Sequence, residues 1–446
     1  MKFTSGDSGL SNIFFVIAIS FLPDISDIKQ KSFNFANKFL EVYKTGVLNN
    51  GIRIIHKEVR SDVAHCGFII NTGSRDEGAN QHGMAHFIEH MLFKGTKKRK
   101  AFHVLSRLED IGGEIDAYTT KEETCISASF LCEFYERTIE LFNDVIFNSV
   151  FPDKEIEKEK DIIFDEINSY KDSPADLIFD EFEELLFQGH PLGLNILGDQ
   201  KDISKFNKKR IFDFIRTNYH TDQMVFCSIG CIKFNKLFDY CNKYFGQNHS
   251  NYRKTKRISI KKSDKKRIIK DKATHQAHCI IGTRAYPLYE PKRKILLLIS
   301  NLLAGPGMNS RLNMILREKH GISYTVESSY ILFTDTGNFN IYFGTDKDKL
   351  EKCLFLIYKE LEKLKSNILG PVQLSKTKKQ VIGQLAISNE INSNQLISMG
   401  KSFLLYNKVN SLKESYKEIN SITEKQIIEV ANEIFQRDNF SELIYR

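Results

Sequence analysis

The chain has 446 residues and a mass of 51.6 kDa, enough for about two to four domains with sizeable cores. Hydrophobic residues make up 41% and charged residues 27% of it, which excludes a disordered chain and a bundle of membrane helices and favours a soluble multidomain protein. The formal charge is +8, but the 11 lysines and arginines and two aspartates between Asn251 and Lys272 contribute +9, leaving −1 for the rest. So confined a basic stretch favours a solvated linker. Nucleic-acid binding through it is the less favoured interpretation.

Residues 1–42 are predicted to be an N-terminal extension. Their apolar run, Ile13–Leu22, has ten residues and is too short to cross a bilayer. It resembles the core of an export signal, but a single Lys2, offset by Asp7, precedes it and no clear cleavage site follows. Since no arginine occurs before Arg53, a mitochondrial presequence is also disfavoured. We expect a cytoplasmic protein without integral membrane association, with export as the alternative.

The regular part of the chain begins near Tyr43. A turn at Asn50-Gly51 precedes one predicted strand, and a second strand over Val63–Thr72 is expected to pair with it as a hairpin. The alternating stretch Glu114–Phe130 predicts further strands. Helical periodicity occurs over Met84–Phe93, Ala101–Ile111, Glu133–Phe147 and Asp153–Tyr170. This mixture favours an α+β fold over a doubly wound parallel sheet.

The cysteines give no sign of a disulfide framework or a metal cluster. All eight lie in scattered apolar runs without a Cys-x-x-Cys pair, which predicts buried thiols in a reducing compartment. Cys227 and Cys231 share a strand-like run whose alternation would place both on one face. No further ligands accompany them at metal-binding spacing.

The chain also shows signs of an internal repeat. The segment starting Ala64-His-Cys is echoed by Ala277-His-Cys, an offset of 213 residues. Each is followed within about 30 residues by a Gly-Met pair expected to open a helix, at Gly83 and at Gly307. A duplicated domain of about 200 residues is predicted, with the basic stretch between the copies.

The strongest chemical motif is His86-Phe-Ile-Glu-His90 on a predicted helix. At about 100° per residue, the two histidines lie about 40° apart on one face, and Glu89 lies about 60° from His86 on the other side. Two imidazoles four residues apart can bind one Zn²⁺, and a nearby carboxylate can accept a proton from the metal's water. The alternative is a helix with incidental histidines.

A zinc site needs a third protein ligand. The predicted helix Glu155–Ile167 carries Glu159 and Glu166, seven residues and two turns apart on one face. One of them could bind the metal while the other stands behind it.

The segment Gly83–Thr96 closely resembles the signature of the pitrilysin/insulinase family of zinc peptidases, the inverzincins. The resemblance runs from about Tyr43 through nearly the whole chain and includes Ile111–Thr119, His190–Gly193, Ile196–Gly198 and Leu316–Thr325. The family's third ligand, a Glu about 75 residues after the second His, corresponds to Glu166.

The resemblance implies two homologous domains, each a mostly antiparallel sheet covered by helices, facing each other across a cleft. We expect a catalytic domain over residues 43–248, a basic linker over 249–274 and a substrate-gripping domain over 275–446. The second half lacks a His-x-x-Glu-His motif of its own. One half is therefore expected to do the chemistry while the other shapes the cleft.

The resemblance also implies a metalloendopeptidase with one Zn²⁺ per chain. His86, His90 and Glu166 would hold the metal, Glu89 would serve as general base for the attacking water, and Glu159 would orient ligands or water.

An extended peptide or unfolded polypeptide substrate would add a strand along the edge formed by Ala117, Tyr118 and Thr119. Arg317 and Tyr324 would clamp it from the second domain.

Two positions depart from the family pattern. Asp116 stands where Asn is usual, and Asp accepts hydrogen bonds but cannot donate them. Leu194 replaces a frequent Arg. Family members that have lost the metal site act as non-catalytic assembly or substrate-presenting subunits, which is the alternative function. The intact motif argues against it. Pairing as a homodimer, or with a related chain, is expected.

Overall fold

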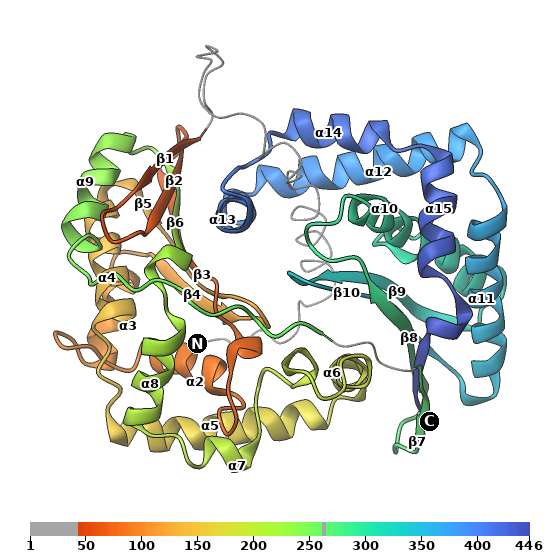
Figure 1. The fold of residues 1–446 in the computed structure, drawn as a ribbon, viewed down its shortest axis with the longest axis horizontal. Helices are drawn as coiled ribbons and strands as arrows, with labels where there is room; N and C mark the ends of the chain where they lie inside the picture. Colours follow the sequence, from red (N-terminus) through yellow and green to blue (C-terminus); the bar gives the residue numbers. More distant parts are fainter. Residues whose placement is uncertain (1–42, 261–264) are drawn as a thin grey trace.

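The computed structural model describes residues 43–260 and 265–446, so the predicted N-terminal extension and its apolar run lie outside the described residues. Within the described ranges the chain forms two sheets with helices around them (Figure 1). No helix in these ranges combines the length and the apolar character needed to cross a membrane.

The first sheet has six strands in the order β1-β2-β6-β3-β5-β4. Only β2 and β6 pair in parallel. The strands are β1 (Lys44–Val47), β2 (Arg53–Glu58), β3 (Val63–Ile70), β4 (Glu114–Thr119), β5 (Thr124–Leu131) and β6 (Met224–Gly230).

The second sheet has five strands in the order β7-β11-β8-β10-β9, and only β7 and β11 are parallel. They are β7 (Arg267–Lys270), β8 (Ala277–Ala285), β9 (Ser323–Leu332), β10 (Gly337–Thr345) and β11 (Ser441–Tyr445). The two sheets have the same topology once β1 is set aside. The first then runs β2-β6-β3-β5-β4 and the second β7-β11-β8-β10-β9, so the first to fifth strands of each half take the same places in their sheets. The predicted fold class of two similar α+β halves is confirmed.

Two details of the predicted strand and repeat pattern are wrong. The hairpin at Asn50-Gly51 joins β1 to β2, and β6 from far along the chain lies between β2 and β3. Local sequence cannot reveal such an insertion because the pairing partner lies more than 150 residues away. Gly307 does not open a helix equivalent to that at Gly83, since the first helix after β8 is α10 (Arg293–Ala304), which precedes Gly307.

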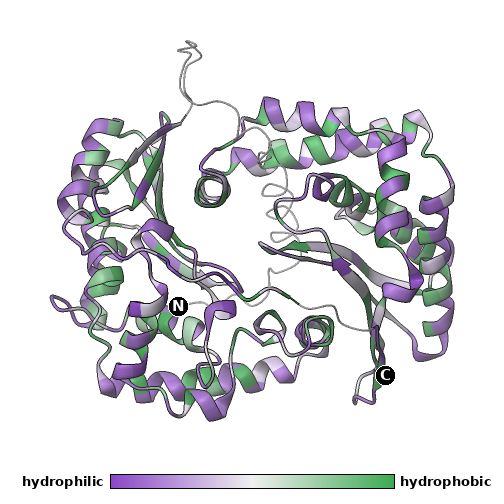
Figure 2. Ribbon diagram, viewed as in Figure 1, coloured by the Kyte–Doolittle hydropathy of each residue, from purple (hydrophilic) through white to green (hydrophobic). Residues whose placement is uncertain are grey.

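The helices predicted in the first half are present with ends shifted by a few residues. This half contains α2 (Met84–Met91), α3 (Ala101–Glu109), α4 (Tyr135–Phe147), α5 (Asp153–Lys171), α6 (Pro174–Leu186), α7 (Gln200–Ile203), α8 (Lys208–Asn218) and α9 (Phe234–Tyr244). The second half contains α10, α11 (Leu350–Ser366), α12 (Pro371–Glu390), α13 (Asn392–Tyr406), α14 (Leu412–Ser421) and α15 (Glu424–Ile434). Outer helices such as α9 and α14 mix hydrophilic and hydrophobic residues, as amphipathic surface helices do (Figure 2).

The two halves exchange one helix each. On the first sheet, alternate residues of β6 face opposite cores: Phe226 packs with α2, α4 and α9, whereas Val225 and Cys227 pack against α13 of the second half. On the second sheet, Ile280 and Leu443 pack against α6 of the first half. Figure 1 shows α13 beside the first sheet and α6 beside the second. Both sheets are therefore buried on two faces.

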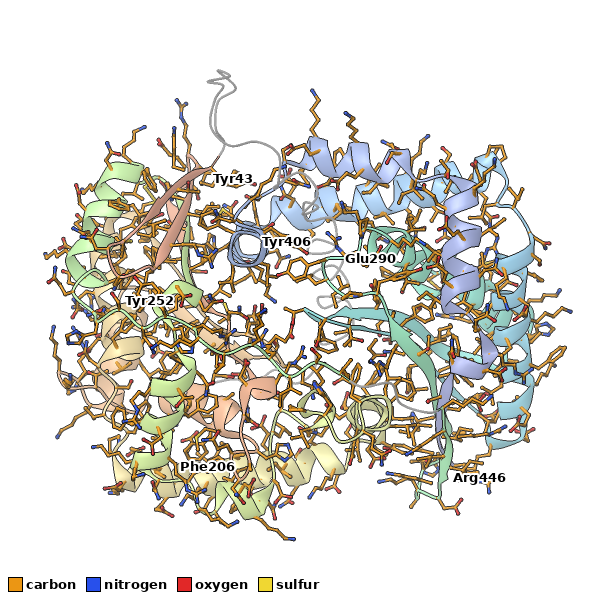
Figure 3. The ribbon with its side chains drawn as sticks, in the orientation of Figure 1. Tyr43, Phe206, Tyr252, Glu290, Tyr406 and Arg446 are labelled. Atoms are coloured by element: carbon orange, nitrogen blue, oxygen red, sulfur yellow. A yellow bond between two sulfur atoms is a disulfide. The ribbon has the colours of Figure 1, made fainter. Side chains whose placement is uncertain are left out.

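Close backbone approach makes this exchange possible. A Cβ at Gly400 of α13 would lie 2.5 Å from Ile69 Cδ1 and 2.8 Å from Cys227 Sγ, and one at Gly282 of β8 would lie 2.9 Å from Phe182 of α6. The far end of α13 stays anchored in its own half, because the Tyr406 hydroxyl donates to the Leu288 carbonyl at 3.0 Å. Figure 3 shows Tyr406 near Glu290.

The described part of the basic stretch packs against the first half. Arg257 donates to both carboxylate oxygens of Asp76 at 2.9 and 2.8 Å, and Arg253 lies 3.8 Å from the same carboxylate. Both arginine side chains are largely buried. Their charges are therefore used inside the molecule, which weakens the nucleic-acid interpretation of this stretch.

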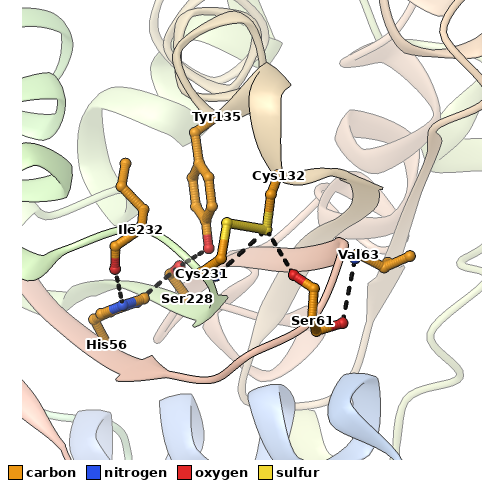
Figure 4. Close-up of a disulfide and its surroundings, with 8 residues drawn as sticks. All are labelled: His56, Ser61, Val63, Cys132, Tyr135, Ser228, Cys231 and Ile232. Carbon is orange, nitrogen blue, oxygen red and sulfur yellow. Dashed lines mark hydrogen bonds between the residues drawn. A yellow bond between two sulfur atoms is a disulfide. The ribbon is translucent and has the colours of Figure 1, made fainter.

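One cysteine expectation is wrong. Cys132, just after β5, forms a disulfide with Cys231, just after β6, with 6.2 Å between the Cα atoms (Figure 4). The strand ends at Gly230, so Cys231 does not continue the alternation of Cys227. The partners are 99 residues apart, and only the alignment of β5 and β6 beside β3 brings them together. The other six cysteines are buried free thiols, as predicted.

Candidate metal centre

Helix α2 holds the His-x-x-Glu-His motif in the core of the first half. Seven of its eight residues are buried, and the exposed fractions of His86 and His90 are 8% and 6%. The helix begins at Gly83, whose φ of 94° favours glycine and whose missing Cβ would meet the Gly198 Cα at 2.7 Å. The backbone at Gly198 lies too close to Gly83 for any residue with a side chain at this position.

Helix α5 packs against α2 and brings its carboxylates to the two imidazoles. Oε2 of Glu166 lies 3.8 Å from Nε2 of His86 and 3.7 Å from Nε2 of His90. One ligand atom from each of the three residues lies within 4.8 Å of the others. The structure thus brings together the three side chains predicted as metal ligands.

Glu159 lies behind His90 and contacts its other ring nitrogen. Its Oε1 is 2.9 Å from His90 Nδ1, and because an ionised carboxylate only accepts, the imidazole donates through Nδ1, while Nε2 faces Glu166. Lys94 Nζ lies 2.6 Å from the second Glu159 oxygen. Burial tends to raise the pKa of Glu159, but the contacts with His90 and Lys94 outweigh it and hold the pKa below its usual value.

The donor set fits a zinc ion. Burial, reinforced by neighbouring His90, lowers the pKa of His86 to about 3, so the imidazole is neutral at pH 7 and has a lone pair to give. Two imidazoles and one carboxylate are the ligand types of catalytic zinc sites with an open position. Glu159 supplies the carboxylate partner that such histidines commonly have.

Glu89 lies on the same helix next to this cluster and is not among the three ligands. Burial raises its pKa, while the Thr119 hydroxyl and His90 offset part of the rise and Asp116 and Glu166 add to it. A carboxyl group poised closer to neutrality is what a general base requires.

The predicted substrate-binding strand, β4, is an edge strand. It pairs with β5 only, so its other side has unpaired backbone groups. Thr119 faces Glu89, and Ala117 packs on the same core as α2. The Tyr118 side chain faces the opposite way, under Lys401 of α13 at 5.4 Å. Tyr118 can thus offer substrate its backbone but not a free ring.

The two departures from the family pattern lie at the surface. Asp116 is exposed, and its Oδ1 accepts from the Ala117 amide at 2.9 Å. The Leu194 side chain is 40% exposed, while its carbonyl accepts from buried Lys121. Neither residue contacts the three ligand side chains.

Arg317 and Tyr324 both lie on the second half. Arg317 is in a π-helical segment, Asn313–Lys319, and faces Glu318 at 3.7 Å. Tyr324 near the start of β9 is 76% exposed. None of the contacts among the described residues joins either side chain to the metal cluster.

Sequence reasoning missed Lys94. It lies four residues beyond His90, which would place it one turn further along the same face, but α2 ends at Met91. Only the structure shows that the chain after the helix returns Lys94 to Glu159.

Comparison with known proteins agrees with this arrangement. A family model described as Insulinase (Peptidase family M16) matches residues 53–200, which contain the His-x-x-Glu-His motif and Glu166. A model described as Peptidase M16 inactive domain matches residues 205–381. The match of the second model agrees with the absence of a second His-x-x-Glu-His motif.

Relatives and solved structures match along most of the chain. It is 31% identical to an uncharacterized zinc protease of Bacillus subtilis (87% of this chain, 95% of the relative) and 30% identical to one of Rickettsia felis (91% and 98%). A protease from Helicobacter pylori shares the fold with a TM-score of 0.84 at 21% identity (91% of this chain, 99% of that one). A peptidase M16 inactive domain from Pseudomonas fluorescens also has a TM-score of 0.84, at 19% identity (90% and 98%). The chain therefore belongs to the insulinase family of peptidases, family M16.

Proposed function

We propose that the protein is a zinc-dependent metalloendopeptidase that hydrolyses extended peptides or unfolded polypeptide segments. The observation that carries the proposal is the convergence of His86, His90 and Glu166, with ligand atoms within 4.8 Å of one another, beside the half-buried carboxyl group of Glu89, which is not a ligand. The zinc protease names of the relatives support it at the level of the family.

His86, His90 and Glu166 would hold one zinc ion per chain. When bound, zinc supplies Lewis-acid chemistry that polarises the scissile carbonyl and lowers the pKa of the attacking water toward about 7. Glu159 keeps His90 in the tautomer that offers Nε2, and Lys94 keeps Glu159 ionised.

Glu89 performs the proton transfers. It accepts a proton from the water whose oxygen adds to the carbonyl carbon, and it delivers that proton to the amine that leaves as the C–N bond breaks. A positioned base of this kind contributes about 10²–10⁴-fold to the rate.

The substrate backbone would pair with the open side of β4, at Ala117, Tyr118 and Thr119, as an added strand. Arg317 and Tyr324 would contact it from the second half across a cleft. Because β4 offers main-chain groups, this mode requires an extended, unfolded substrate segment.

The domain limits, the assembly and the location of the protein are also proposed. We propose domains over residues 43–248 and 275–446 with a linker over 249–274, and a homodimer or a pair with a related chain. We propose a cytoplasmic location, with export as the alternative.

The test is metal analysis and cleavage by the purified full chain. We expect about one zinc per chain, cleavage of an unfolded carboxymethylated protein detected by mass spectrometry, loss of cleavage after chelation and its return with added zinc. A chain that binds zinc but cleaves nothing would favour the non-catalytic subunit. A chain that binds no zinc would contradict the proposed metal centre.

A further inference from the structure

The amides at the start of α2 lack a cap from their own helix. Gly83, the N-cap residue, has no side chain, and the first turn contains no acidic residue. The usual N-cap residues Ser, Thr, Asp and Asn are excluded at this position by the φ of 94° and by the contact with Gly198. The groups that satisfy these amides must therefore come from elsewhere.

Glu77 supplies them from the preceding turn. Its Oε2 accepts from the Gly83 amide at 3.0 Å and its Oε1 from the Ala85 amide at 2.9 Å. The Met84 amide donates to the Gln81 carbonyl at 2.9 Å. One carboxylate thus satisfies two of the first-turn amides, at the helix end where negative charge is favourable.

The turn that carries Glu77 is itself fixed on both sides. Arg75 donates to Asp335 of the second half at 2.7 and 2.6 Å, and Asp76 accepts from Arg257 of the linker. Arg75, Asp76 and Glu77 are consecutive, so the second half, the linker and the start of α2 are held by one short segment. The position of Glu77 is consequently set by the contact of Arg75 with the second half and by that of Asp76 with the linker.

The Glu77 side chain is also enclosed by the protein. It is 8% exposed, and burial raises its pKa although the two amides and Lys121 oppose the rise. Because the side chain is enclosed and holds two backbone amides, a change at this position is expected to act directly on the first turn of α2.

We propose that Glu77 is a positioning residue of the metal centre, which fixes the first turn of α2 one residue before His86. This inference rests on the proposed function. The hydrogen bonds of the Glu77 carboxylate go to backbone amides and not to the three ligand side chains. It acts through the Gly83 and Ala85 backbone, by setting where the helix starts and thereby where both imidazoles and Glu89 point.

The variant to make is Glu77→Gln, which keeps the shape but turns an NH₂ donor toward one of the two amide donors. The matched control is Ser411→Ala, which removes a cap from α14, where Ser411 Oγ accepts from the Glu414 amide at 3.2 Å. Both variants lose a helix cap, but only α2 carries the proposed ligands.

Three measurements distinguish the outcomes. In the metal-free chain, hydrogen exchange of peptides spanning residues 81–93 should speed up in Glu77→Gln and stay unchanged in Ser411→Ala. Cobalt(II) affinity should fall about 10–100-fold in Glu77→Gln only, with an altered visible spectrum. Turnover should fall through kcat, with KM within about twofold.

Equal exchange, cobalt affinity and spectrum in Glu77→Gln and the parent would overturn the inference. So would unfolding of the whole chain in this variant, because Glu77 would then support overall stability rather than the site. Failure of the proposed function has a different signature: the parent itself would bind no metal or cleave no substrate, whatever the exchange data show.

Discussion

At the scale of residues, the Lys94–Glu159–His90 contacts decide which nitrogen of His90 is available. Glu159 is almost completely buried between an imidazole and an ammonium group, at 2.9 and 2.6 Å. Replacing it by Gln removes the charge that fixes the tautomer and balances Lys94. We expect Glu159→Gln to bind zinc about 10–100-fold more weakly, measured by competition with a chromophoric chelator.

The control for this prediction is Glu157→Gln on the same helix. Glu157 is 70% exposed and pairs with Lys160, so its loss should leave zinc affinity within about twofold. Equal affinity in the two variants would mean that Glu159 has no part in the metal centre.

The pH dependence of stability follows from His86. Burial lowers its pKa from the ordinary value of 6.5 to about 3, so between these pH values the unfolded chain takes up a proton that the folded, metal-free chain does not. The free energy of unfolding therefore decreases as pH falls below 6.5, by about 1.4 kcal/mol per pH unit from this group.

Urea unfolding of the metal-free parent and of His86→Gln at pH 7, 6 and 5 measures this contribution. The parent should lose more stability than the variant over this range, because Gln does not titrate. Parallel curves for the two proteins would contradict the buried, neutral imidazole.

At the scale of elements, the exchange of α6 and α13 depends on glycines at the contacts. A Cβ at Gly400 would come within 2.5 Å of Ile69, whereas one at Gly383 of α12 would meet nothing within 4 Å. We expect Gly400→Ala to destabilise the protein by about 1–3 kcal/mol through overpacking. Gly383→Ala should stabilise it by about 0.5–1 kcal/mol through helix propensity.

Thermal unfolding of the two variants checks this pair of opposite effects. The midpoint should fall for Gly400→Ala and rise for Gly383→Ala. Equal shifts would indicate that α13 does not pack on the first sheet as described.

The sequence could predict the elements that local periodicity specifies. The spacing of His86, Glu89 and His90 requires only the geometry of one helix, and the same holds for Glu159 and Glu166 on α5. Periodicity does not show which of Glu159 and Glu166 is the third ligand, because both lie on the same face of the helix. Only the family resemblance identifies Glu166. The structure separates them by their contacts, one with Nδ1 and one with Nε2 of His90.

At the scale of the whole molecule, the missed features all depend on distant segments. The insertion of β6, the exchanged helices and the Cys132–Cys231 bond each join residues about 100 or more positions apart. Glu77 is a related case: it caps a helix only a few residues away, but the need for it follows from the distant contact of Gly83 with Gly198. Tertiary packing decides these contacts, and no local pattern records it.

The first half is expected to carry out catalysis and the second half to bind the substrate. If Arg317 and Tyr324 only grip the substrate, Arg317→Ala and Tyr324→Phe should keep zinc and fold while raising KM. If the Tyr324 hydroxyl also stabilises the oxyanion, Tyr324→Phe should lower kcat by about 10²-fold. Steady-state kinetics on one extended peptide, with zinc measured in parallel, separate these cases. Unaltered kcat and KM in both variants would show that the second half has no role in binding at these positions.

If the site consists of three metal ligands and a separate base, Glu89→Gln should abolish turnover and keep the metal. Zinc content and turnover should be measured on the same preparation of this variant and of the parent. We expect about one zinc per chain in both and loss of at least about 10²-fold in kcat for the variant, because an amide cannot accept the water's proton. Cleavage by Glu89→Gln at near the parent rate, or loss of its zinc, would contradict this expectation.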